Sequence, residues 1–494
     1  MEPLLSQPEK PREAAVSGNL LLWEHLRSTL LHLLNLSILI LFFLIESYLI
    51  ILQHHLNPFY HLLTFSSLLV LLVSLSSYCL RAPSPVYVVD YVCFKPPNFC
   101  RIPFSSFLEH TQMMGDSFDS KGVAFMEKIM NLSGLSEQTY LPPGLHFIPP
   151  RSGHQEAINE VRMVLFPIFQ QLLSNNKLSP KDIDILVVNC SGFCPDPSLA
   201  SIIVNNFDMR DDVKTFNLTG MGCSANTVAV DMVRNIMKTH RRCNAVILST
   251  EILSTGWYPG KERAFLVLNC IFRMGGAAVL LSNKREAKSV AKYKVLWSLR
   301  TQGAFDDRRY NAAIRDEDSQ GITGMKLNGD VLYVAGETLR THIPILGAKF
   351  LPITEILRFL ASAFKKKFLD DKDSETEIYV PNFKSAIQHF CFPATGKSVV
   401  RETAKRLKLG DIDMEAALMT LYRFGNQSSA SLWYELAYLE AKERVKKGDK
   451  VWQLGMGTGP KCNSLVLQCI RPILGEAQKG PWADSIHKYP ILLP

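Results

Sequence analysis

The sequence predicts an α/β protein built from two related halves and preceded by a pair of apolar segments. Three observations lead to this fold class. Short β-branched runs alternate with helical patterns over most of the 494 residues, two apolar stretches lie near the N-terminus, and a strand–turn–helix pattern surrounds Cys223. This alternation favours mostly parallel sheets, because each buried strand is followed by a helix that covers it.

The two apolar stretches are long enough to cross a bilayer as a helical hairpin. Residues 29–52 would extend about 36 Å as a helix, against a hydrocarbon core of about 30 Å. A second apolar run covers residues 61–80, after a polar break. A signal peptide is the competing interpretation, but its apolar region is shorter and no second span follows it. Basic residues flank the hairpin and are absent from its loop, which predicts that both ends face the cytosol. The flanking basic residues are Lys10, Arg12, Arg27, Arg81, Lys95 and Arg101.

The chain divides at these features. We expect a cytosolic tail at 1–28, two transmembrane helices within 29–82, a first α/β half at 83–285 and a second at 286–494. The Pro- and aromatic-rich residues 83–103 are typical of an ordered connector. The expected strands are residues 183–188, 213–218, 245–249, 277–281, 378–380 and 451–454, and a helix is expected at 225–240.

Composition limits the class of partner. The formal net charge is +8, which fits attraction to anionic membranes or to acidic substrates such as coenzyme A esters, and equally fits an ordinary solvated basic surface. The basic residues form no stripe, zinc-finger spacing or RNA-binding pattern, so we do not expect nucleic-acid binding. Cys190 and Cys194 have no second pair at a zinc-site interval, so no metal is expected, and the scattered cysteines fit reduced thiols facing the cytosol.

Cys223 is the candidate nucleophile. The turn Gly220-Met221-Gly222 joins an expected strand to an expected helix and places the thiol at the junction. Unpaired N–H groups and the positive end of the helix dipole would lower the pKa of a thiol there from about 8.5. The glycines would let a thioester approach the backbone. The alternative is a buried structural cysteine.

Motifs along nearly the whole chain resemble those of plant 3-ketoacyl-CoA synthases, the condensing components of very-long-chain fatty acid elongation. The matching segments are Thr139-Tyr140-Leu141-Pro142-Pro143, Asn189-Cys190-Ser191, Gly220-Met221-Gly222-Cys223-Ser224-Ala225, Phe272-Arg273-Met274-Gly275-Gly276-Ala277-Ala278, Arg423-Phe424-Gly425-Asn426, Trp433-Tyr434-Glu435-Leu436-Ala437-Tyr438, Lys461-Cys462-Asn463-Ser464 and Gly480-Pro481-Trp482-Ala483-Asp484. This ordered set is highly specific to the family.

The resemblance implies a thiolase-like fold of two related α/β halves, with the nucleophile at the start of a buried central helix. It also implies the reaction. The Cys223 thiolate takes an acyl group from acyl-CoA, malonyl-CoA loses carbon dioxide, and the resulting enolate attacks the acyl-enzyme to give 3-ketoacyl-CoA. No redox cofactor or metal is needed. The implied partners are another synthase subunit, in a homodimer or heterodimer, and the elongase reductases and dehydratase. The implied location is the endoplasmic reticulum membrane, with the α/β halves facing the cytosol.

The chain departs from the family pattern at its histidines. Asn426, an expected donor to the enolate oxygen, is present. Pro393 replaces the histidine that normally opens a His-Ala-Gly-Gly-Arg run, and proline has neither a side-chain donor nor a backbone N–H. Gln302 and Tyr422 match two further family histidines and do not titrate near neutral pH. His389 matches another family histidine and is a candidate acid or base.

These departures lead to competing hypotheses. The first is a condensing enzyme of elongation with weak or altered activity, since one missing oxyanion donor lowers the rate about 10² to 10³-fold and a missing base about 10² to 10⁴-fold. The second is a catalytically inactive regulatory subunit that binds active synthases or other elongase components. A third is an enzyme that uses the Cys223 thioester without decarboxylation. Condensation of acyl-CoA with malonyl-CoA by the purified protein discriminates among them.

Overall fold

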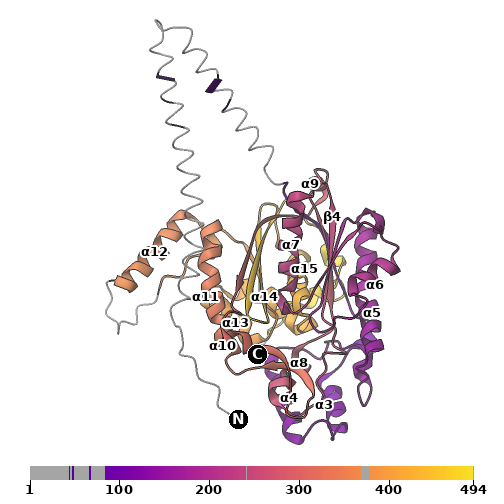
Figure 1. The fold of residues 1–494 in the computed structure, drawn as a ribbon. Coiled ribbons are helices and arrows are strands. Elements are labelled where there is room, and N and C mark those ends of the chain that lie inside the picture. Colours follow the sequence, from indigo (N-terminus) through magenta and orange to yellow (C-terminus); the bar gives the residue numbers. More distant parts are fainter. Residues whose placement is uncertain are drawn as a thin grey trace, which may run out of the picture. The chain divides into compact units, whose positions relative to one another are not determined.

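The structure is a computed structural model that describes residues 84–240, 242–368 and 378–492, with the isolated positions 40, 44, 47, 48, 66, 67 and 70. Ser84–Pro494 form one compact unit (Figure 1). Apart from those isolated positions, the expected transmembrane hairpin at 29–82 lies outside the described residues. Among the residues that are described, no helix combines the length and apolar character needed to cross a bilayer.

A mixed sheet of nine strands is the framework of this unit. In spatial order its strands are β3 (Lys214–Leu218), β2 (Ile185–Asn189), β4 (Asn244–Thr250), β5 (Gly276–Ser282), β1 (Tyr87–Cys93), β6 (Tyr293–Gln302), β11 (Lys461–Cys469), β10 (Lys450–Gly457) and β9 (His389–Cys391). A separate two-stranded sheet consists of β7 (Ala313–Glu317) and β8 (Thr323–Leu327). Strands β2, β4 and β5 are buried along their full lengths, as their continuous apolar sequences predict.

The same series of strand pairings occurs twice in the large sheet. In the first half, β2 and β4 are parallel, β4 and β5 are antiparallel, and β5 and β1 are antiparallel. In the second half, β9 and β10 are parallel, whereas β10 with β11 and β11 with β6 are antiparallel. A short antiparallel pairing of β1 with β6 joins the two series. The prediction of mostly parallel sheets is therefore wrong, because a strand that is buried on both faces reads as continuously apolar in either direction.

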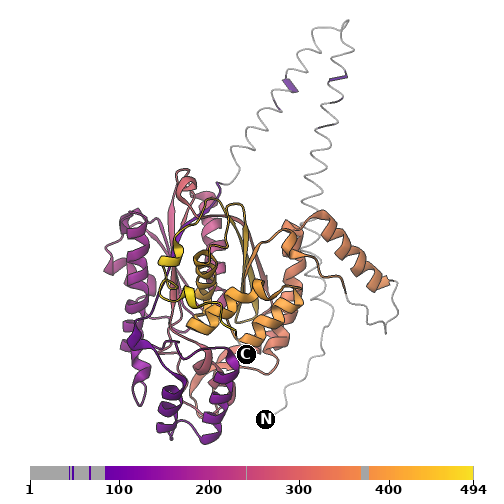
Figure 2. The same cartoon turned by 180° about the vertical axis from the view of Figure 1, so that it is seen from behind.

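Helices cover the outer faces of the sheet and also fill the space between its two halves (Figure 1, and from behind in Figure 2). The central helix α7 (Ala225–Thr239) packs on β2 and β4 of the first half and on β6, β10 and β11 of the second. Helix α15 (Ser431–Ala441) is almost wholly buried and contacts β1, β9 and β10. The outer helix α5 (His154–Asn175) lies on the first half, and α11 (Val331–Phe350) lies on the second. The N-terminus of α7 therefore begins inside the unit.

The remaining helices pack around this framework. They are α3 (Phe104–Met113), α4 (Ser120–Ser133), α6 (Leu199–Asn206), α8 (Arg263–Ile271), α9 (Ala287–Val290), α10 (Asp307–Asn311), α12 (Ile353–Phe368), α13 (Lys397–Arg406) and α14 (Asp411–Phe424). Helix α4 contacts α3 and α8, and α14 contacts α13 and α15. Helix α8 also contacts β8, and α14 also contacts β9.

Two expectations about secondary structure are wrong. Residues 83–103 contain β1, which lies inside the sheet between β5 and β6, so this segment is not simply a connector. Its prolines lie before and after the strand rather than within it, because proline cannot donate to a central strand ladder. Residues 378–380 are not in a strand. There, the N–H of Tyr379 donates to Ser362 Oγ at 2.8 Å instead of to a neighbouring strand.

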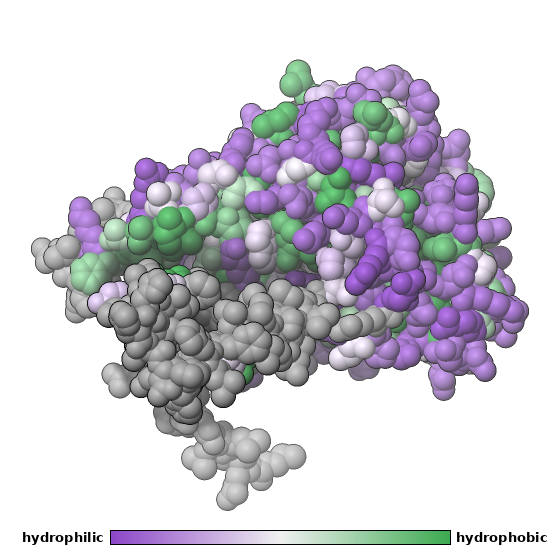
Figure 3. All heavy atoms as spheres, turned by 90° about the horizontal axis from the view of Figure 1, so that it is seen from above, coloured by the Kyte–Doolittle hydropathy of each residue, from purple (hydrophilic) through white to green (hydrophobic). Residues whose placement is uncertain are grey.

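Helix α12 presents apolar side chains to the surface. Ile353, Leu357, Leu360 and Phe364 are exposed and recur every three or four residues, which places them on one side of the helix. Hydrophobic residues gather on the left of Figure 3, the side on which Figure 1 shows α12. This side of α12 therefore adds little to the core of the unit.

Candidate active site

Cys223 lies between a strand and a helix, as the sequence predicts. Strand β3 ends at Leu218, and Gly220 and Gly222 have φ values of +65° and +55°. A short 3-10 turn, η4 (Gly222–Ser224), then leads directly into α7. Residues with a side chain rarely adopt this left-handed backbone conformation, so the glycines shape the turn. The turn delivers the thiol to the interior end of α7.

The loop after β10 packs directly against this turn. A Cβ atom added to Gly222 would lie 2.8 Å from the backbone nitrogen of Thr458, and a Cβ on Gly457 would overlap the carbonyl of Met221. Thr458 Oγ1 also donates to the carbonyl oxygen of Gly220 at 3.3 Å. At Gly222 the space expected for a thioester is thus taken by residues 457–458, whereas a Cβ on Gly220 would meet open space.

The environment of Cys223 raises rather than lowers the pKa of its thiol. Burial is the largest cause and raises the pKa to about 11, although a hydrogen bond from Ser428 and the amide of Asn426 act in the opposite direction. The prediction of a lowered pKa is therefore wrong. Removing the thiolate from water outweighs the benefit of the helix N-terminus.

Cys223 lies in the wall of a cavity of about 660 Å³ that also includes Asn426 and Pro393. This volume falls within the range of typical small-molecule sites. Much of the wall is apolar and comes from α4, α8 and α11, through Ile129, Leu132, Val267, Ile271, Val331 and Leu332. The cavity therefore combines one nucleophile, a few polar groups and a large apolar wall, which suits a ligand with a reactive end and a hydrocarbon body.

Asn426 is held in place by its backbone and presents a buried amide to the cavity. Its N–H donates to the carbonyl of Ile271 at 3.2 Å, and its carbonyl accepts from the N–H of Arg273 at 2.9 Å. Its side-chain Oδ1 accepts from the N–H of Ser428 at 2.8 Å. Its Nδ2 is buried and makes no hydrogen bond of ordinary geometry to the described residues, although the amide lies near enough to Cys223 to favour the thiolate. This nitrogen is a donor available for a ligand oxygen.

The family motifs around Asn426 contain two buried arginines that fix this segment. Arg273 Nε donates to Thr139 Oγ1 at 2.9 Å, and Arg423 Nη1 donates to the carbonyl of Gln138 at 3.0 Å. Gly425 has a φ of +77°, and a Cβ there would overlap the side chain of Arg273. These residues support the site without lining the cavity.

The positions that match family histidines separate in space. Pro393 follows β9 and lines the cavity with Cys223. Gln302 is exposed at the end of β6. Tyr422 lies on α14, where its ring packs edge-on against Tyr489 with centroids 6.4 Å apart. Neither Gln302 nor Tyr422 lines the cavity.

His389 lies far from the nucleophile. It begins β9, and its Nε2 is 3.0 Å from Asp449 Oδ2. Its partner in the sheet is Val451, near the start of β10, whereas Gly457 at the other end of β10 packs against the Cys223 turn. At about 3.3 Å per residue, these ends are roughly 20 Å apart. This placement does not support His389 as the acid or base.

Sequence reasoning missed Glu251, which faces the same cavity. It follows β4, and its Oε1 accepts the N–H groups of Ser191, at 3.0 Å, and Gly192. Burial raises the pKa of this carboxyl, while these hydrogen bonds oppose the increase. Strands β2, β3 and β4 are parallel, so residues that follow them meet at one edge of the sheet. That rule, applied to the predicted strands 183–188, 213–218 and 245–249, is the signal that could have found Glu251 beside Cys223.

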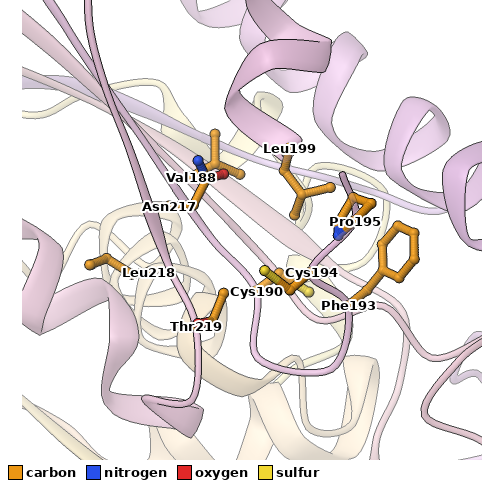
Figure 4. Close-up of a pocket in the computed structure, with 9 residues that line it drawn as sticks. All are labelled: Val188, Cys190, Phe193, Cys194, Pro195, Leu199, Asn217, Leu218 and Thr219. Atoms are coloured by element: carbon orange, nitrogen blue, oxygen red, sulfur yellow. The ribbon is translucent and has the colours of Figure 1, made fainter. Parts of the chain in front are cut away.

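A second hollow is too small for a ligand. It has a volume of about 10 Å³, room for about one water molecule, and lies between the ends of β2 and β3 and the loop that carries Cys194 (Figure 4). Cys190 is buried and Cys194 is exposed, and both are free thiols. Within the described part of the chain, no three His, Cys, Asp or Glu side chains gather as metal ligands.

Comparison with known proteins first defines the class. The profile of the FAE1/type III polyketide synthase-like family matches residues 78–368, and that of the 3-oxoacyl-[acyl-carrier-protein] synthase III C-terminal region matches residues 383–469. The fold is similar to that of ORAS, a fungal type III polyketide synthase, with a TM-score of 0.58. It is also similar to 1,3,6,8-tetrahydroxynaphthalene synthase from Streptomyces coelicolor A3(2), a bacterial type III polyketide synthase, with a TM-score of 0.57.

Those two structures are each 16% identical to this chain over 78% of its length, and cover 100% and 99% of their own chains. They confirm the predicted thiolase-like α/β fold. Closer relatives then identify the family. 3-Ketoacyl-CoA synthase 5 of Arabidopsis thaliana is 46% identical over 87% of this chain and 86% of its own length. 3-Ketoacyl-CoA synthase 6 of the same plant is 44% identical over 87% of this chain and 85% of its own length. The chain belongs to the 3-ketoacyl-CoA synthase family.

Proposed function

We propose that the protein condenses an acyl-CoA with malonyl-CoA to give 3-ketoacyl-CoA, carbon dioxide and coenzyme A in very-long-chain fatty acid elongation. The observation that carries this proposal is the position of Cys223, at the start of α7 and in the wall of a large apolar cavity beside the unpartnered amide of Asn426. A thioester on Cys223 would extend its hydrocarbon chain along the apolar wall. Names of the curated relatives support the same reaction class.

Each polar group of the cavity has a role in this reaction. Cys223 forms the acyl-enzyme and splits the transfer into two steps. The Nδ2 of Asn426 would donate to the enolate oxygen that develops when malonyl-CoA loses carbon dioxide. Arg315 and Lys461 also line the cavity and supply positive charge for the phosphates of coenzyme A.

Turnover should be slower than in synthases that have a histidine at position 393. The backbone carbonyl of Pro393 accepts a hydrogen bond from the N–H of Thr395 at 2.8 Å. The proline ring has no donor for an enolate oxygen. Loss of one oxyanion donor removes about 2.7–4 kcal/mol of transition-state stabilisation, a factor of about 10² to 10³ in rate.

The test is condensation of labelled malonyl-CoA with a series of long acyl-CoAs by the purified full-length chain. The proposal predicts slow formation of 3-ketoacyl-CoA that is abolished in Cys223→Ala and increased in Pro393→His. Product formation that persists in Cys223→Ala would reject the assignment.

One observation favours a second function. The cavity has a large volume and an apolar wall, whereas the histidine position holds a side chain that can neither donate nor accept a proton. This combination is expected of a regulatory subunit that keeps the fold and binds active synthases or other elongase components. Such a subunit gives no product alone but changes the rate or product length of a co-purified active synthase.

We also propose a location and partners that fit this role. The sequence features at 29–82 support insertion in the endoplasmic reticulum membrane as a hairpin, with the unit at 84–494 facing cytosolic coenzyme A esters. A homodimer or heterodimer of synthases, and association with the elongase reductases and dehydratase, would pass each product to the next step. Glycosylation mapping of full-length protein tests the topology, because an occupied Asn131 or Asn217 sequon would place the unit in the lumen.

A further inference from the structure

Three side chains from three separate segments meet at the nucleophile. Ser428 Oγ lies 3.5 Å from Cys223 Sγ and 3.2 Å from Glu251 Oε2. Cys223 lies in η4, which leads into the central helix α7, and Glu251 follows β4. Ser428 begins η6 (Ser428–Ala430), which lies between α14 and α15. The hydroxyl therefore bridges the thiol and the carboxylate within the cavity.

The serine is held in this bridging position. Ser428 is buried, and its N–H donates to Asn426 Oδ1 at 2.8 Å. Its φ is +55°, a left-handed conformation that is uncommon for residues other than glycine. Backbone strain of this kind persists only where the surrounding contacts fix it, and it occurs preferentially at functional sites.

The carboxylate is also oriented toward the serine. Its Oε1 accepts the N–H groups of Ser191 and Gly192 and lies 3.7 Å from the Cys190 thiol, while its Oε2 is left to Ser428. In the part of the chain that the structure describes, no cation lies within ion-pair distance of Glu251. One carboxylate oxygen is thus anchored, and the other is available to accept a proton.

We propose that Glu251, acting through Ser428, accepts the proton of the Cys223 thiol and so supplies the base that Pro393 cannot. This inference rests on the proposed role of Cys223 as nucleophile. A serine hydroxyl has one hydrogen, so it can donate to only one neighbour at a time. While the O–H of Ser428 donates to Glu251, the S–H of Cys223 can donate to Ser428 Oγ.

Transfer along this chain balances in protons and charge. The thiol proton moves to Ser428 Oγ as the hydroxyl proton moves to Glu251 Oε2, which leaves a thiolate, a neutral hydroxyl and a carboxylic acid. The thiolate forms a bond to the carbonyl carbon of acyl-CoA, and the bond from that carbon to the coenzyme A sulfur breaks. The leaving thiolate takes the proton back from Glu251 through Ser428.

The acidities are consistent with such a relay. The pKa of Cys223 is raised to about 11, so few thiolates form at neutral pH without a base. Burial raises the pKa of Glu251, which makes the carboxylate a better proton acceptor. The other ionisable groups near this pair are Cys190, Glu160, Arg315 and Lys461. Glu160 accepts hydrogen bonds from the backbone N–H groups of Leu253 and Ser254. Arg315 donates to the carbonyl of Gly192.

The experiment is the pH profile of Cys223 alkylation by iodoacetamide in the purified full-length chain. The peptide that contains Cys223 is quantified by mass spectrometry, and the exposed Cys194 is the internal reference. In the unmodified chain, the rate should level off well below the pH at which the thiol itself ionises, because ionised Glu251 removes the proton. In Glu251→Gln and in Ser428→Ala, the rate should rise about tenfold per pH unit without a plateau and be at least about tenfold lower at pH 7.

The variants separate a relay from a nearby charge. A negative charge disfavours the thiolate, so a Glu251 that acted only as a charge would give faster alkylation in Glu251→Gln; that result, or profiles identical to the unmodified chain, overturns the relay. Glu160→Gln, which alters a neighbouring buried carboxylate that does not contact Ser428, should keep the plateau. Ser428→Ala removes a single hydroxyl, so it tests the relay even where Glu251→Gln lowers stability. A plateau without condensation would reject the proposed condensing function and leave the relay supported.

Discussion

The backbone nitrogen of Thr458 lies 2.8 Å from the point where a Cβ on Gly222 would be. This approach joins the loop after β10 to the turn that carries the nucleophile. The two segments come from opposite halves of the sheet, so their contact depends on the complete fold.

Gly222→Ala should therefore slow acylation of Cys223. The added methyl pushes the backbone of residue 458 away and displaces the thiol, and a misplacement of about 1 Å can lower a rate about 10²-fold. The measurement is acyl-enzyme formation from radiolabelled stearoyl-CoA. Gly220→Ala is the matched control, since its φ is also positive but a Cβ there meets open space; equal loss in both variants would show that backbone strain alone is responsible.

Asn426→Asp should separate acylation from condensation. Aspartate keeps the Oδ1 that accepts from Ser428 but has no Nδ2 to donate to the enolate. We expect condensation to fall about 10² to 10³-fold, while acyl-enzyme still forms on Cys223. Single-turnover acylation and steady-state condensation are measured on the same preparation. A variant that condenses at the unmodified rate would remove Asn426 from the mechanism.

His342 should make stability depend on pH. It is buried between Thr301 Oγ1, at 2.8 Å, and Ser464 Oγ, at 2.7 Å, and burial lowers its pKa to about 3. Unfolding returns the pKa to about 6.5, so the unfolded chain binds more protons between these values. The contribution of neutral His342 to the free energy of unfolding is complete above about pH 6.5. It is lost as pH falls toward 3, by about 1.4 kcal/mol per pH unit. Urea midpoints between pH 7.5 and 5 should fall more steeply in the unmodified chain than in His342→Leu; parallel slopes would contradict the assignment.

Lys292 should contribute strongly to stability. Its buried ammonium lies 3.0 Å from Glu440, 3.3 Å from Asp90 and 3.4 Å from Glu476. Lys292→Met leaves these carboxylates without their cation, which destabilises a protein by about 3–5 kcal/mol. The measurement is the thermal midpoint, with Lys181→Met as control, because the Lys181–Asp208 pair is exposed and should contribute little. A small decrease in the thermal midpoint of Lys292→Met would mean that water reaches these carboxylates.

Largely apolar runs were the most dependable predictors of the fold. Residues 183–188, 245–249, 277–281 and 451–454 all lie within or overlap observed strands, because burial on both faces favours apolar side chains at most positions. The direction of those strands was not predictable, since neighbours of either orientation bury the same residues. β1 was missed because prolines lie close to it on both sides. Residues 378–380 were misassigned because three residues carry too little pattern.

The sequence by itself determined which residue is the candidate nucleophile, which family the motifs match, and that Pro393 removes a proton carrier. Those properties depend on residue type and on short-range order along the chain. Only the tertiary structure decided which side chains reach Cys223: it brings Asn426, Pro393, Glu251 and Ser428 to the cavity and leaves His389, Gln302 and Tyr422 outside it. The reason is physical, because these segments are joined by strand register and helix packing across two halves of a sheet, and neither can be read from one segment alone.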